Sequence, residues 1–168
     1  MKKLLAILLL ICVCFGVTAC DPTSYYHYHN SERVAEITAI ELINYDYPDA
    51  VQINTFFSTR GVERFDFEKM SVIEVVNEDT FADFLQDLSE IKIWTSWIHS
   101  DSPFGICLRI IYKNGDFEVV SADSELPFFA RYNNRGRLRS YLGMFEENER
   151  DFSELVNKHF VTQIAVPD

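Results

Sequence analysis

The Asn-Gly pair at residues 114–115 constrains the fold of this chain more than any other feature. Asn-Gly accepts the positive φ angles of a two-residue type I′ turn, which joins neighbouring antiparallel strands. With that turn, Tyr112 lies opposite Phe117, and Ile110 lies opposite Val119. These large apolar pairs then share one face of a hairpin, as a sheet that covers a core requires. The pattern therefore predicts an antiparallel sheet built around residues 107–122.

Several further segments have the alternating or β-branched composition that is typical of strands. They are residues 34–44, 51–58, 62–67, 70–76 and 91–98, and a second hairpin is expected to join 128–132 to 137–142. Together with the first hairpin they predict a mostly antiparallel sheet of about six to eight strands.

Two segments have the apolar spacing of amphipathic helices, at about residues 80–89 and 149–160. Apolar side chains recur there at intervals of three and four residues, so each helix presents one apolar stripe. Asn148 is positioned to cap the second helix. Because strands and helices do not alternate as in a parallel sheet, we expect an α+β fold in which two helices pack on the sheet.

The first 19 residues have the layout of a cleaved targeting signal. Lys2 and Lys3 are followed by an apolar run over residues 4–17 and by the small residue Ala19, just before Cys20. The run is shorter than the roughly 20 apolar residues that a membrane-spanning helix needs. We therefore expect residues 1–19 to be removed from the mature chain.

The tetrad Val17-Thr18-Ala19-Cys20 resembles the lipobox of bacterial lipoproteins. The resemblance implies that Cys20 carries diacylglycerol and a further acyl chain such as palmitate, and so anchors the protein to the lipid bilayer. It places the mature chain at the extracytoplasmic face of the cell membrane, or in the periplasm of a two-membrane bacterium. Residues 20–32 lack an apolar period and are interpreted as a flexible tether to a single α+β domain over residues 33–168.

The charge balance excludes one class of partner. The whole chain has a formal charge of −11, and removal of residues 1–19 leaves 13 basic against 26 acidic residues. Such a chain repels phosphate polymers, so no nucleic acid is expected as a partner.

Motifs for catalysis and for cofactors are absent from the sequence. It contains no G-x-S-x-G, H-E-x-x-H, Walker loop, G-x-G-x-x-G or C-x-x-C. We therefore predict a non-catalytic binding or interaction domain in the cell envelope, without a cofactor. Two alternatives stay open: a small hydrolase or transferase that acts on envelope material, and an accessory subunit or inhibitor of another envelope protein.

A cluster of basic residues in the second hairpin is the best candidate for a ligand site. Its members are Arg131, Arg135, Arg137 and Arg139, with Tyr141 two positions further along the strand. Guanidinium groups beside an aromatic ring suit a small acidic or sugar-acid ligand, or an acidic partner protein. The alternative is that these arginines balance carboxylates of the chain itself.

Two aromatic segments are weaker candidates. Trp94 and Trp97 have opposite strand parity, so one indole is expected to face outward, where it could contact a sugar ring or a partner protein. His27 and His29 could contribute two ligands to a metal ion, but two ligands are half of a site. We therefore expect no metal centre.

Overall fold

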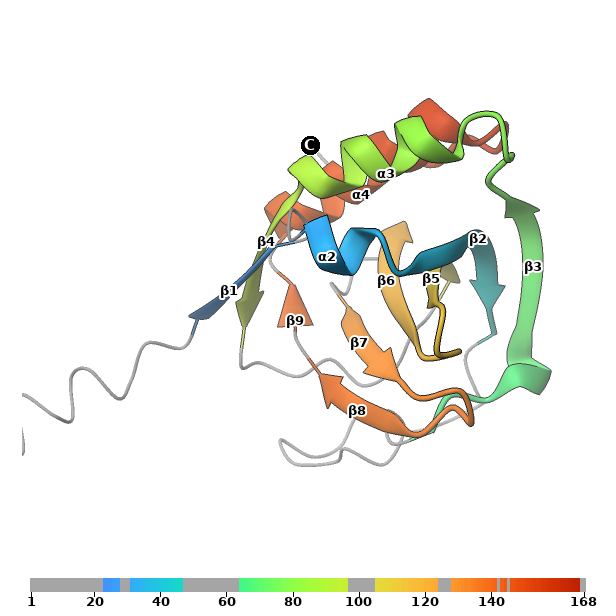
Figure 1. Cartoon of the computed structure of the whole chain (residues 1–168), viewed down its shortest axis with the longest axis vertical. Helices are drawn as coiled ribbons and strands as arrows, with labels where there is room; N and C mark the ends of the chain where they lie inside the picture. The colour runs from blue at the N-terminus through green and yellow to red at the C-terminus, as the bar shows by residue number, and fades with distance from the viewer. Residues whose placement is uncertain are drawn as a thin grey trace, which may run out of the picture.

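Two antiparallel sheets and two long helices make up the described part of the chain (Figure 1). The structure, a computed structural model, describes residues 23–27, 31–46, 64–96, 105–123, 128–141, 143–144 and 146–166. The helices are α2 (Ser31–Val34), η1 (Phe67–Lys69, a 3-10 turn), α3 (Phe81–Glu90) and α4 (Glu146–His159). The strands are β1 (Thr23–His27), β2 (Ile37–Tyr45), β3 (Met70–Val75), β4 (Lys92–Ser96), β5 (Gly105–Tyr112), β6 (Phe117–Asp123), β7 (Phe129–Tyr132), β8 (Leu138–Tyr141) and β9 (Gly143–Met144).

The larger sheet has six strands in the order β3-β2-β5-β6-β7-β8, and every neighbouring pair is antiparallel. The smaller sheet has the order β1-β4-β9 and is also antiparallel. In Figure 1, α3 and α4 lie side by side across one end of the molecule. The expected α+β fold, an antiparallel sheet packed with two helices, is confirmed.

The large sheet separates two apolar cores. The first lies between the sheet and the helices, where Phe84 of α3 and Phe152 of α4 are fully buried beside Ile110 of β5. The second, on the opposite face, is aromatic: the ring of Phe117 lies 5.1 Å from that of Phe65 and 5.4 Å from that of Tyr132. Both faces of the central strands are therefore covered, which explains their nearly continuous apolar sequences.

The register predicted for the first hairpin is wrong by one residue. The loop has three residues rather than two, because the Tyr112 carbonyl accepts from Gly115 N–H at 2.8 Å and Tyr112 N–H donates to the Asp116 carbonyl at 2.9 Å. Gly115 has a φ of 80°, as the last position of a three-residue hairpin loop requires. The strands consequently pair Ile110 with Glu118, rather than with Val119.

The predicted helices are present, but α4 begins earlier than expected, at Glu146. Asn148, expected as its cap, lies inside the helix and is buried. Its side-chain amide donates to the carbonyl of Lys92 at 2.7 Å and so joins α4 to β4. A short polar side chain at a helix start can serve either purpose, so the sequence alone does not distinguish them.

Two segments before the large sheet differ from simple expectation. Residues 23–27, part of the stretch interpreted as a tether, form β1 and pair with β4. Residues 31–34, which span the end of the expected tether and the first residue of the expected strand 34–44, form α2, and the strand itself begins at Ile37. The strand expected at residues 51–58 lies outside the described residues.

One edge of the large sheet, β3, exposes apolar side chains. Val72, Ile73 and Val75 are each between 41% and 52% exposed. The acidic residue of this strand, Glu74, accepts the backbone N–H groups of Val161 and Thr162 beyond α4. Burial raises the pKa of Glu74, but these hydrogen bonds outweigh it and hold the pKa below its usual value. The Glu74 carboxylate is therefore fixed to the end of α4.

Candidate functional site

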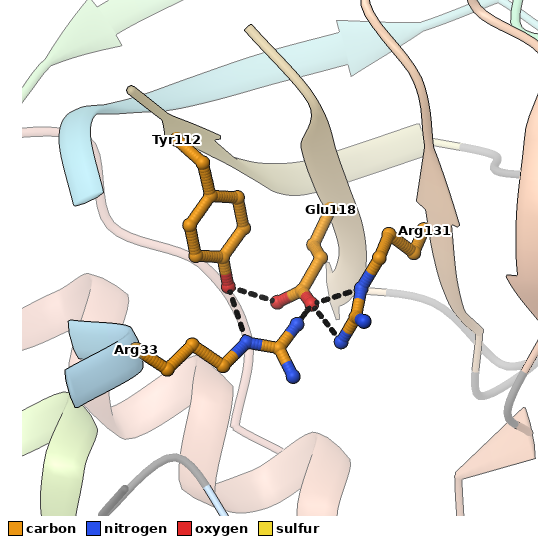
Figure 2. A network of polar contacts seen from close by, with 4 residues as sticks. All are labelled: Arg33, Tyr112, Glu118 and Arg131. Atoms are coloured by element: carbon orange, nitrogen blue, oxygen red, sulfur yellow. Dashed lines mark hydrogen bonds and ion pairs between the residues drawn. The ribbon is translucent and has the colours of Figure 1, made fainter. Parts of the chain in front are cut away.

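A buried carboxylate lies at the centre of the most extensive polar network in the described structure. Glu118 of β6 is fully buried, and Figure 2 shows three side chains directed at it. Arg131 of β7 contacts Glu118 Oε1 through Nε at 2.9 Å and through Nη2 at 2.8 Å. Tyr112 donates its hydroxyl to Oε2 at 2.8 Å, and Arg33 of α2 forms an ion pair with Oε1.

This network fixes α2 to the sheet. Arg33 Nε also donates to the hydroxyl of Tyr112 at 3.1 Å, which closes a ring of contacts between α2, β5 and β6. Burial raises the pKa of Tyr112, and the charge of Arg33 opposes this rise. A buried carboxylate needs such partners because an unpaired charge would be strongly destabilising there. The network therefore serves the stability of the fold.

The network also distinguishes Arg131 from the other arginines of the predicted cluster, because Arg131 forms an ion pair within the fold. Its guanidinium balances a carboxylate of the chain itself, which is the alternative that the sequence left open. Arg33, Arg109 and Arg150 likewise form ion pairs with carboxylates.

The remaining arginines of the predicted cluster surround the β7–β8 turn. Asn133 shapes the turn, since its side-chain oxygen accepts the N–H groups of Arg135 at 3.0 Å and Arg137 at 2.9 Å. Gly136 follows with a φ of 74°, a conformation that favours glycine. Arg135, Arg137 and Arg139 are all exposed.

A fourth exposed arginine, Arg64, joins them from a distant part of the chain. Its backbone forms an antiparallel bridge with that of Arg137, and the N–H of Phe65 donates to the Gly136 carbonyl at 2.7 Å. A Cβ at position 136 would lie 2.6 Å from the Phe65 carbonyl oxygen, so this close approach requires glycine. Phe65, buried in the aromatic core, holds the segment in place.

We define the arginine cluster as Arg64, Arg135, Arg137 and Arg139. Among the described residues, no ion pair involves any of the four. Arg64 was not predicted as a site residue, because it lies far from the hairpin in the sequence and belongs to no recognisable motif. No local feature of the sequence identifies Arg64, because its place beside the hairpin depends on the packing of Phe65 in the aromatic core.

The other predicted site residues are less well defined. Trp94 lies on β4 opposite Tyr25, and Tyr141 lies on β8 opposite Ala130, but the side chains of Trp94 and Tyr141 are not among the described ones. His27 is the last residue of β1. Cys20, His29 and Trp97 lie outside the described residues.

A groove of about 380 Å³ lies between the C-terminal end of α3, the start of β4, and α4. Four carboxylates and two lysines line it, over Ile91 and Leu155. Hydrogen bonds from Lys158, at 2.6 Å, and from His159 hold the pKa of Asp87 below its usual value. Burial raises the pKa of Asp151 on the opposite wall. The groove thus offers charged groups, but no serine, cysteine or histidine is among its described lining residues.

Neither a metal site nor a membrane span emerges from the part of the chain that the structure describes. No group of three or more histidine, cysteine, aspartate or glutamate side chains is arranged there to hold a metal ion. None of the helices in these residues has the length and apolar character needed to cross a bilayer.

No known protein family, curated protein or solved structure matches this chain.

Proposed function

We propose that this chain is a membrane-anchored extracytoplasmic lipoprotein whose folded domain is a non-catalytic binding module. The anchor rests on the N-terminal sequence, in which a basic start, an apolar run and the tetrad ending at Cys20 occur together. A diacylglycerol group buries two acyl chains, and each buried methylene contributes about 0.8 kcal/mol to membrane affinity.

The arginine cluster supports the binding role. Four exposed arginines lie on or beside the β7–β8 hairpin in a chain whose formal charge is −11. Arginines that served only to balance the acidic residues of the chain would be expected to form ion pairs, as Arg33 and Arg131 do. The single observation that carries the proposal is therefore that no ion pair within the described residues balances the charge of Arg64 and its neighbours. Its complement is an acidic ligand or an acidic surface of another envelope protein.

The anchor is tested by expressing the full chain and its Cys20→Ala variant in a bacterial host and separating membrane from soluble fractions. We expect the parent protein in the membrane fraction, with a lipid-modified N-terminal cysteine in its mass spectrum. The variant should lose this modification. An intact starting methionine, or an unmodified thiol at position 20, would overturn the assignment.

Binding is tested by crosslinking and pull-down of the anchored protein from its own membranes. The double variant Arg137→Ala plus Arg139→Ala should lose the captured partner, because it removes half of the arginine cluster. Arg150→Ala is the matched control, since Arg150 is an exposed arginine of α4 paired with Glu154. Equal capture by the double variant and the parent would rule out the cluster as the binding surface.

A further inference from the structure

We propose that Arg64 and Arg137 together bind the phosphate group of a small ligand, such as a phosphomonoester or inorganic phosphate. This inference rests on the proposed binding function and specifies its ligand chemistry. The two residues form an antiparallel backbone bridge, so they lie directly opposite each other. Side chains of such a pair project from the same side, with Cβ atoms roughly 5 Å apart.

Like charges in directly opposite positions destabilise a strand pair. The fold nevertheless enforces this arrangement, because Phe65 is 1% exposed and its N–H donates to the Gly136 carbonyl at 2.7 Å. An anion held between the two guanidinium groups would remove the repulsion. Relief of the repulsion between the two arginines therefore contributes to the binding free energy of the anion.

Among the described residues, nearby carboxylates do not supply that anion. Asp66, two residues after Arg64, accepts the backbone N–H of Glu68 at 3.1 Å. Asp116, at the adjacent hairpin, accepts the backbone N–H of Asn134 at 3.3 Å. Neither forms an ion pair with the arginine cluster within the described structure.

The stoichiometry of hydrogen bonds favours phosphate over a single carboxylate. Two guanidinium groups that bind one carboxylate must share its two oxygens, as Arg33 and Arg131 share Oε1 of Glu118. A phosphate group has three or more acceptor oxygens and accepts a fork from each arginine. Arg135 and Arg139 flank Arg137 by two residues each and add positive charge around the same position.

A small phosphate ligand is also compatible with the net charge of −11. The screening length in physiological salt is about 8 Å, so the distant carboxylates of the chain contribute little at the site. A long polyanion would instead extend beyond the arginine cluster and meet the acidic surface.

The test is calorimetric titration of the full chain, purified in a non-ionic detergent and in a buffer free of phosphate and sulfate. The probes are inorganic phosphate, glycerol 3-phosphate and, as the carboxylate comparison, acetate at matched ionic strength. We expect saturable binding of one or both phosphate compounds and no saturable binding of acetate. Stronger binding of the phosphomonoester would identify an esterified ligand, and stronger binding of inorganic phosphate would identify the free ion.

Arg64→Gln and Arg137→Gln should each weaken the binding at least tenfold, whereas Arg150→Gln should change it less than twofold. The melting temperature without phosphate gives an independent readout, because relief of the repulsion should leave it unchanged or raise it. Failure of phosphate to bind, equal binding of acetate, or an unchanged affinity of Arg64→Gln would overturn the inference. A lowered melting temperature of both glutamine variants would do so too, since the arginines would then be structural. Partner capture that fails in Arg137→Ala plus Arg139→Ala, together with no phosphate binding, would leave the proposed function standing and reject this ligand.

Discussion

The buried network around Glu118 gives the sharpest stability prediction. The substitution Glu118→Gln keeps the size of the side chain but removes the negative charge that Arg33 and Arg131 share. Breaking a buried ion pair by changing one partner costs about 3–5 kcal/mol, because the remaining charge is left uncompensated. Here the two arginine side chains are 19% and 30% exposed, so water can partly hydrate them after the change. We therefore expect Glu118→Gln to lower the free energy of unfolding by about 3 kcal/mol, the lower end of this range.

Two further variants show how much each member of the network contributes to the free energy of unfolding. Arg33→Met should cost less, about 1–2 kcal/mol, because Arg131 and Tyr112 still satisfy the carboxylate through hydrogen bonds to a charged group. Glu154→Gln is the matched control, since Glu154 and Arg150 are both more than half exposed and such pairs contribute at most about 0.5 kcal/mol.

Urea unfolding followed by far-ultraviolet circular dichroism measures these free energies, and an unchanged slope would show that the folded and unfolded states remain comparable. The reasoning would be refuted if Glu118→Gln cost less than 1 kcal/mol, or no more than the Glu154→Gln control. It would also fail if Arg33→Met proved the more damaging change, because the carboxylate would then not be the centre of the network.

Three further predictions concern other parts of the fold. Because the pKa of Asp87 is lowered in the folded state, its charged form stabilises the protein above the unfolded pKa of about 4, and this contribution is lost as the pH falls through the folded pKa. Asp87→Asn should therefore flatten the dependence of the melting temperature on pH at acid pH. An unchanged pH profile would contradict this prediction. Gly136→Ala should lower the free energy of unfolding by more than about 2 kcal/mol, because it combines a positive φ with a 2.6 Å contact to the Phe65 oxygen. Gly115→Ala, which lacks such a contact with backbone, should lower it by about 1 kcal/mol. Comparable urea midpoints for the two variants would contradict the close approach at Gly136. Asn148→Ala removes a buried hydrogen bond to β4 and should cost about 1–3 kcal/mol in the same assay, and a change under 0.5 kcal/mol would mean that this bond is not important.

The α+β class and the positions of the two long helices could be predicted because they depend on local periodicity. Phe84 and Leu88 recur on one helical face, and both are fully buried in the first core. The second hairpin was also predictable, since Gly136 supplies the positive φ that its turn needs. In these segments, local propensity and tertiary packing favour the same structure.

The strand pairing of the first hairpin could not be predicted from local sequence. Asn-Gly fits both a two-residue turn and a three-residue loop with glycine last, and these differ by one position in the strand pairing. Normally a one-residue slip exposes the apolar face, but Ile110 and Ile111 are both apolar and pack on opposite cores. The alternation was therefore uninformative. The same shift pairs Glu118 with Ile110 and so brings the carboxylate to the helix-covered face, a position that the predicted register did not give it.

The arginine cluster was only partly visible in the sequence for a different reason. Arg135, Arg137 and Arg139 are close in the chain, so composition alone revealed them. Arg64 joins them through one backbone bridge between distant segments. Arg131 instead pairs with Glu118, which the predicted register placed on the opposite face of the sheet. Long-range pairing of this kind has no local signature, because it is decided by how Phe65 packs in the aromatic core.

The outer edge of β3 governs how copies of the protein behave when they are crowded together. Natural sheet edges usually carry a lysine, a proline or an outward-facing carboxylate that discourages pairing with another strand. Since Glu74 is engaged at the end of α4, the repulsion between copies depends on the net charge, which is −13 once residues 1–19 are removed. Molar salt shortens the reach of that repulsion to about 3 Å. Concentrated solutions are thus expected to stay monodisperse at low ionic strength, and light scattering should detect edge-to-edge aggregates as salt is added.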